Sequence, residues 1–175
     1  TANSLNDLNT KINNASGNIT IKITNLSTNQ NQTFGNANKS VTLIVDNLSV
    51  TSSNRTITVF GNLIVLNDID LRSTSIVVRK TSAQTDGNFY IDSSFSTYSN
   101  YNFAVDNMLY IANDLTFSQP TSVSANSLLM GKGMVNSNYN STFNIAGNTF
   151  IKDDMRIGNL ATFTKVLPAI LNVEL

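Results

Sequence analysis

The segment Gly61–Ser73, GNLIVLNDIDLRS, decides the fold. Its apolar run breaks at the polar pair Asn67 and Asp68 and resumes at once with Ile69 and Leu71. Asn and Asp favour turns because their side chains hydrogen-bond to nearby backbone groups. We therefore interpret the segment as two short strands joined by a corner, after which the chain re-enters the same core.

The same arrangement recurs along the chain. Each copy is a polar or glycine-containing pair followed by one large apolar residue, which we call the anchor. The anchors are Leu26, Leu48, Ile69, Phe95, Leu115, Met134 and Met155. Their spacings are 22, 21, 26, 20, 19 and 21 residues. A fixed period of this length is typical of proteins built from stacked repeats.

Three further features follow the same period. A second apolar column stands five residues before each anchor, at Ile21, Leu43, Ile64, Tyr90, Tyr110, Leu129 and Phe150. A third strand-like segment follows the anchor, at residues 56–59, 75–78, 102–105, 121–123, 142–145 and 162–164. Six of the eight glycines precede Asn, and both residue types tolerate the positive φ that corners require.

These features predict an all-β protein with a β-solenoid domain over residues 17–166. The solenoid would contain about seven coils of ~21 residues, because a unit this short buries its apolar face only against its neighbours. The residues 79–86, RKTSAQTD, lengthen one repeat and are expected to form a bulging loop. The alternative is a β-sandwich or jelly roll, which also has many short strands but does not require anchors at a fixed spacing.

The two ends have different patterns. In residues 1–16, Leu5, Leu8 and Ile12 share one helical face, and Ser4 with Asp7 resembles a capping box. We expect a short amphipathic helix that caps the open sheet edge of the first coil.

The tail, residues 167–175, is strongly apolar. It either folds back along the solenoid's own side or adds as a strand to a neighbouring subunit. The candidate assembly residues are Ala169, Ile170, Leu171 and Val173.

The composition excludes several kinds of site. Charged residues make up only 13% of the chain and the net charge is zero, which disfavours nucleic acid and polybasic membrane binding. The chain has no Cys or His, so no thiolate or imidazole can hold a metal, and we predict no cofactor. No apolar stretch is long enough for membrane insertion. The neutral polar surface favours an extracellular or cell-surface location.

The acidic residues at the corners are the first place to look for catalysis. Asp68, Asp114 and Asp154 occupy equivalent positions, but in alternate coils, about 10 Å apart. We interpret them as corner residues and predict that the protein is not an enzyme. A calcium site at Asp153 and Asp154, or at Asp68, lacks the spacing of a calcium-binding loop.

Two other surface features are candidates for modification or binding. The chain has eight Asn-x-Ser/Thr sequons, a number that its abundance of Asn, Ser and Thr nearly accounts for. The candidate glycosylation sites are Asn25, Asn31, Asn47 and Asn54.

The segment 89–103 is rich in aromatic residues, and Tyr98 and Tyr101 could form a sugar-binding face or pack in the core.

The phrase GNLIVLNDIDL resembles the repeats of prokaryotic surface β-solenoid proteins and, more distantly, those of bactofilins. The resemblance covers about residues 17–164. It implies a solenoid fold, and bactofilin likeness implies polymerisation without nucleotide. We therefore expect a structural subunit of an extracellular filament, pilus-like fibre or surface coat, which self-assembles into homo-oligomers through solenoid ends or C-terminal strand donation. The alternative is an adhesin or carbohydrate-binding module whose partners are surface glycans.

Overall fold

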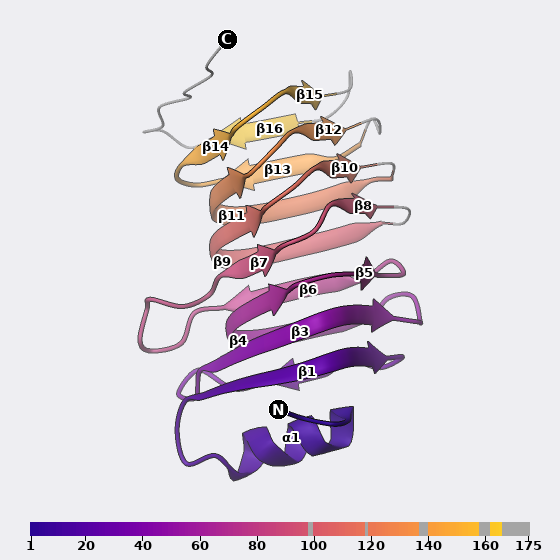
Figure 1. Cartoon of the computed structure of the whole chain (residues 1–175). Helices are drawn as coiled ribbons and strands as arrows, with labels where there is room; N and C mark the ends of the chain where they lie inside the picture. Colours follow the sequence, from indigo (N-terminus) through magenta and orange to yellow (C-terminus); the bar gives the residue numbers. More distant parts are fainter. Residues whose placement is uncertain (98–99, 118, 137–139, 158–161, 166–175) are drawn as a thin grey trace.

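In a computed structural model the chain forms a three-sided β-solenoid with one helix at its N-terminal end (Figure 1). The structure describes residues 1–97, 100–117, 119–136, 140–157 and 162–165. In Figure 1 the near strands run left to right while the chain climbs and the far strands return, so the coil is right-handed. This is the usual hand for parallel crossover connections.

Three faces, each a stack of parallel strands, make up the solenoid. The first face contains the first halves of β1 (Ile19–Thr28) and β3 (Val41–Val50), the second half of β4 (Thr56–Val65), β7 (Phe89–Ile91), the second halves of β9 (Tyr101–Ile111) and β11 (Thr121–Met130), and β14 (Thr149–Ile151). The second face contains the second halves of β1 and β3, then β5 (Ile69–Asp70), β8 (Phe95–Thr97), β10 (Leu115–Phe117), β12 (Met134–Asn136) and β15 (Met155–Ile157).

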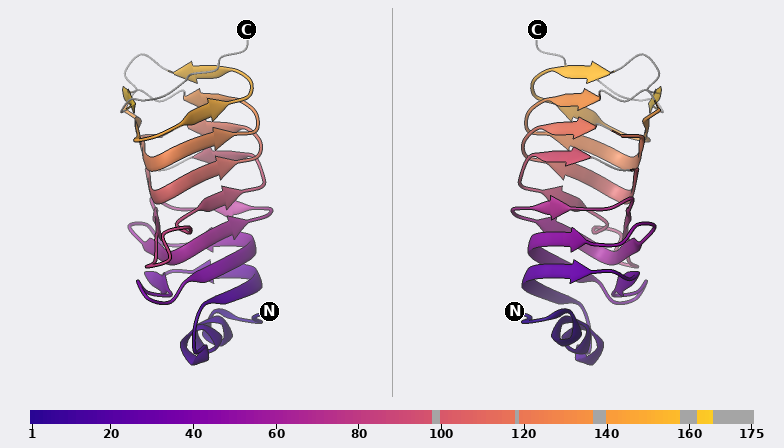
Figure 2. Two further views of the ribbon diagram at one scale, coloured as in Figure 1. Left: turned by 90° about the vertical axis from the view of Figure 1, so that its left-hand side faces the viewer. Right: turned by 90° about the vertical axis from the view of Figure 1, so that its right-hand side faces the viewer.

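The third face contains β2 (Gln32–Phe34), the first halves of β4, β9 and β11, and β6 (Ser75–Arg79), β13 (Thr142–Ile145) and β16 (Thr162–Lys165). We number the rungs from the N-terminal end. Within the described residues each face has seven rungs. Figure 2 shows the stack from two further sides.

The anchors stack in register, as the repeat predicts. Leu26 pairs with Leu48, and Leu48 pairs with Ile69. On later rungs the anchor column continues from Phe95 through Leu115 and Met134 to Met155. Every pairing between named strands of the described chain is parallel, so the alternative of an antiparallel sandwich or jelly roll is wrong.

The second predicted column is only partly correct. Ile21 and Leu43 point into the core and pair with each other, but Leu43 pairs next with Leu63 rather than Ile64. The cause is the corner between the first and second faces. This corner has two residues on rungs 1 and 2 but three from rung 3 onward, so the inward residues of the first face lie one position farther from the anchor. Leu66 is the added residue on rung 3, and it places Ile64 on the outer surface.

The stack on the second face is interrupted between rungs 3 and 4. In the described residues no strand pairing joins β5 to β8, whereas the first and third faces continue through β4, β6, β7 and β9. Aromatic rings fill the interior here. The ring of Phe95 lies 5.6 Å from that of Phe103 and 5.9 Å from that of Tyr101, and Phe89 contacts Phe103 edge-on at 5.9 Å.

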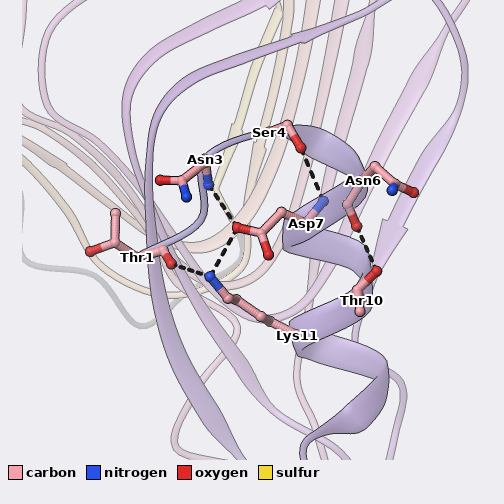
Figure 3. Close-up of polar contacts among 7 residues, drawn as sticks. All are labelled: Thr1, Asn3, Ser4, Asn6, Asp7, Thr10 and Lys11. Carbon is pink, nitrogen blue, oxygen red and sulfur yellow. Dashed lines mark hydrogen bonds and ion pairs between the residues drawn. The ribbon is translucent and has the colours of Figure 1, made fainter.

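The predicted N-terminal helix is present as α1 (Leu5–Asn14). Leu8 and Ile12 are buried against the first rung. The Ser4 hydroxyl accepts a hydrogen bond from Asp7 N at 3.1 Å, and the Asp7 carboxylate accepts one from Asn3 N at 2.9 Å (Figure 3). The Lys11 ammonium, with that backbone bond, lowers the pKa of Asp7 below its ordinary value. Ser4 therefore caps α1, and Asp7 reaches back one residue beyond the cap, to Asn3 N, instead of completing a capping box with Ser4 N.

The predicted bulge is also present, between β6 and β7, on the left in Figure 1. It carries the extra residues of the long repeat without disturbing register, since Ile64 still pairs with Tyr90. A buried carboxylate, Asp86, fixes the loop. It accepts hydrogen bonds from Thr81 N, the Thr81 hydroxyl and the Ser40 hydroxyl at 2.8, 2.6 and 2.7 Å.

Candidate ligand-binding face

The outer surface of the first face carries a column of apolar side chains. Alternation puts every second residue of these strands outside the core. The outward residues in register from rung 2 to rung 7 are Ile44, Ile64, Tyr90, Tyr110, Leu129 and Phe150, and we call them the apolar stripe. Five of them are half-buried, while Phe150 is 46% exposed. Apolar side chains aligned in this way on a surface are typical of binding sites.

The centre of the apolar stripe is a pair of tyrosines. The rings of Tyr90 and Tyr110 lie 6.0 Å apart at an interplanar angle of 59°. Together with Ile64, Leu66 and Asp92 they line a shallow pocket of about 300 Å³. This volume is at the lower end of the range for small-molecule sites.

Polar side chains flank the apolar stripe. On one side the side-chain oxygen Oδ1 of Asn62 accepts hydrogen bonds from Asn88 N and Nδ2 at 3.2 and 2.9 Å, and Asn62 Nδ2 donates to the Thr42 hydroxyl at 3.3 Å. On the other side lies the exposed Asp92. This amide ladder explains why Asn follows Gly61 and Gly87 at the corner: its side chain links successive rungs.

The predicted ligand face is wrong for Tyr101. Its side chain is only 5% exposed, and its hydroxyl donates to the Leu71 carbonyl at 2.7 Å. Tyr98 lies outside the described residues. The sequence contains a signal for the outward tyrosine: Tyr90 stands between Phe89 and Ile91, which are both buried, and alternation then puts Tyr90 outside.

A second pocket, beside the loop, is polar. It has a volume of about 280 Å³, and its lining includes Asn18, Ser40, Asn62 and Asp86. Burial disfavours the charged form of Asp86, but the hydrogen bonds from Thr81 and Ser40 outweigh it and hold the pKa of Asp86 below its ordinary value. The carboxylate is fully used in fixing the loop, so it is not a catalytic candidate.

The corner carboxylates do not form a site. Asp68, Asp114 and Asp154 are exposed; Asp114 accepts a hydrogen bond from Gly133 N at 3.3 Å, and Asp154 lies 3.5 Å from the Arg156 guanidinium. In the part of the chain that the structure describes, no group of three acidic side chains is placed to hold a metal. This geometry agrees with the interpretation of these residues as parts of corners.

The candidate glycosylation sites lie at the surface. Asn25, Asn31 and Asn54 are exposed and Asn47 is half-buried. Asn47 Nδ2, the atom that would carry a glycan, donates to the side-chain oxygen Oδ1 of Asn25 at 2.8 Å. A glycan on Asn47 would therefore break a rung-to-rung bond, whereas none of the contacts described at Asn25 involves its Nδ2. Asn25 is the better placed of this pair.

The candidate assembly residues Ala169, Ile170, Leu171 and Val173 lie outside the described residues. Over the described chain, no helix has the length and apolar character needed to cross a bilayer. Comparison with known proteins gives no matching family model, curated protein or solved structure.

Proposed function

We propose that the chain is a structural subunit of an extracellular filament, pilus-like fibre or surface coat, and that it assembles through the C-terminal end of its solenoid. The supporting observation is the difference between the two ends. Helix α1 packs its buried Leu8 and Ile12 on the first rung, and Ala2 N donates to the Lys22 carbonyl at 2.7 Å. The last rung, with β14, β15 and β16, carries no such helix within the described residues.

Sheet edges present unpaired N–H and C=O groups and recruit further strands. In this proposal another copy pairs with the last described rung, because α1 covers the edge strands at the N-terminal end. The apolar tail supplies the strand in this proposal, with Ala169, Ile170, Leu171 and Val173 as the contact residues. Zero net charge favours self-association because it removes long-range repulsion between copies.

Deleting residues 168–175 tests this proposal. We expect the full chain to form ordered fibres or larger particles in negative-stain microscopy and light scattering, and the truncated chain to stay monomeric. Asn144→Asp, an exposed change on the third face, is the control and should assemble like the unmodified protein. Assembly of the truncated chain, or dispersed monomers of the full chain at high concentration, would refute the proposal.

A second candidate function is that of an adhesin or carbohydrate-binding surface module. The observation that favours it is the outward pair Tyr90 and Tyr110 in a shallow pocket.

A further inference from the structure

We propose that the apolar stripe binds a linear, neutral polysaccharide whose chain runs along the solenoid axis, with Tyr90 and Tyr110 at the centre of the site. The inference rests on the second candidate function and is independent of assembly. The shape, the backbone bonding and the charge of this face each exclude a different competing ligand.

The shape of the stripe favours a linear ligand. It is one side chain wide and, over five rung intervals, about 24 Å long. A stable protein interface buries about 800 Å² on each partner and has a broad apolar centre. Here the columns beside the stripe are mostly polar, with Thr42, Asn62, Asn88 and Asp92, and they widen the apolar surface only at Leu66 and Met108. A second copy of this chain would find too little apolar area.

The backbone excludes an extended peptide as the main ligand. Peptides that bind sheets as strands pair with a free edge. Along the stripe, the strands carrying Ile64, Tyr90 and Tyr110 already pair with a neighbouring strand on each side. A peptide lying across this surface would leave its own N–H and C=O groups without backbone partners. A sugar chain has hydroxyls instead, which side-chain amides and carboxylates can bind.

The side chains suit a sugar. A pyranose ring has an apolar C–H face that packs on an aromatic ring, and a polar rim of hydroxyls. Tyrosine offers both a flat ring and a hydroxyl at small entropic cost. The ring pair supplies the packing surface, and the carboxylate of Asp92 at the pocket edge can accept from sugar hydroxyls.

The charges favour a neutral sugar. Asp46, beside the stripe, is compensated by Lys22, with Nζ and Oδ1 2.8 Å apart. Asp92 lines the pocket itself, and the described residues give it no cation within ion-pair distance. An acidic polysaccharide would place like charges together at this point, which costs binding energy.

Calorimetric titration of the full chain with four neutral hexasaccharides, cellohexaose, chitohexaose, mannohexaose and laminarihexaose, tests the proposal. We expect binding of at least one. Tyr110→Leu should weaken it at least tenfold, and the variant should fold because Leu129 occupies the same column on the next rung. Tyr110→Phe keeps the ring and should bind within threefold of the unmodified protein. Ser122→Ala, outward on the third face, is the control.

Four results would overturn the proposal. They are no binding of any of the four neutral sugars, unchanged binding by folded Tyr110→Leu, stronger binding of polygalacturonate than of the neutral sugars, and a dimer that Tyr110→Leu dissociates. If Tyr110→Leu does not fold, Tyr90→Leu replaces it and should likewise weaken binding at least tenfold, because it removes the other ring of the pair and Ile64 occupies the same column on the preceding rung. A sugar that binds a monomeric protein would support this inference even if the assembly proposal fails.

Discussion

At the residue scale, Gly61 shows how closely the rungs pack. It stands where β4 turns from the third face to the first without leaving the sheet. Its φ is +126°, and a Cβ here would lie 2.3 Å from the Val41 carbonyl oxygen and 2.7 Å from Val41 N. Only glycine combines this backbone conformation with so close an approach of the preceding rung.

Replacing Gly61 by alanine should therefore destabilise the protein severely. We expect Gly61→Ala to lower the free energy of unfolding by about 2–5 kcal/mol, the sum of backbone strain and overpacking. Urea denaturation followed by circular dichroism measures the change. Gly17→Ala is the matched control, because Gly17 also precedes Asn but has no atom within 4 Å of the added Cβ. Equal loss in both variants would contradict the explanation.

At the element scale, α1 protects the first rung. Its exposed face carries Asn6 and Thr10, and its buried face carries Leu8 and Ile12. Isolated helices of ten residues are marginal in water, so α1 depends on this contact with the solenoid. The helix in turn covers the N-terminal edge strands, which would otherwise be open to other chains.

Leu8→Asp should detach α1, since it places a charge in the contact. We expect a loss of about 3 kcal/mol or more and concentration-dependent aggregation through the exposed β1 edge. Analytical ultracentrifugation measures the association. Asn6→Asp adds the same charge on the exposed side of α1 and should leave the protein as it was. A monodisperse Leu8→Asp protein would show that α1 is not what protects this edge.

The elements that sequence reasoning predicted correctly are those with a strong period. The anchor column was read correctly because a polar pair marks each corner, and α1 because Leu8 and Ile12 fall on one face. The prediction that Ile64 faces the core is wrong for a physical reason. Leu63 and Ile64 are both apolar, and hydrophobicity does not reveal which of two neighbours faces inward. Only the added corner residue, Leu66, decides it.

The same limit applies to the candidate site. Tyr101 and Tyr90 lie in one aromatic-rich segment, and composition alone does not separate them. Tyr101 begins a strand on the third face and points into the gap between rungs 3 and 4, whereas Tyr90 alternates outward. The register between rungs, which is a property of the whole stack, determines the difference.

At the scale of the whole molecule, the interruption of the second face divides the stack into three rungs and four rungs. On the second-face side, the described contact that bridges the interruption is the hydrogen bond from the Tyr101 hydroxyl on rung 4 to the Leu71 carbonyl on rung 3. The rings of Phe95 and Tyr101 pack against each other within rung 4. In a solenoid each rung is stabilised mainly by its neighbours. The free energy needed to separate two neighbouring rungs is therefore lowest at this division.

Tyr101→Phe should weaken this division. We expect a loss of about 1 kcal/mol and faster hydrogen exchange at residues 71–75 than elsewhere, because a buried carbonyl loses its donor. Tyr90→Phe removes a hydroxyl from a half-buried side chain and is the control. Exchange that rises evenly over all rungs, or not at all, would contradict a local weak point.

The bulge after β6 has a consequence for how such a rod changes in length. Ile64 and Tyr90 are 26 residues apart and Tyr90 and Tyr110 are 20 apart, yet both pairs stack as adjacent rungs. Residues inserted in this loop therefore project away from the solenoid axis and leave the spacing between rungs unchanged. The number of rungs, and not the number of residues, sets the length of the solenoid along its axis. Residues 82–85 are accordingly a position where a foreign peptide can be displayed at a fixed height on the rod.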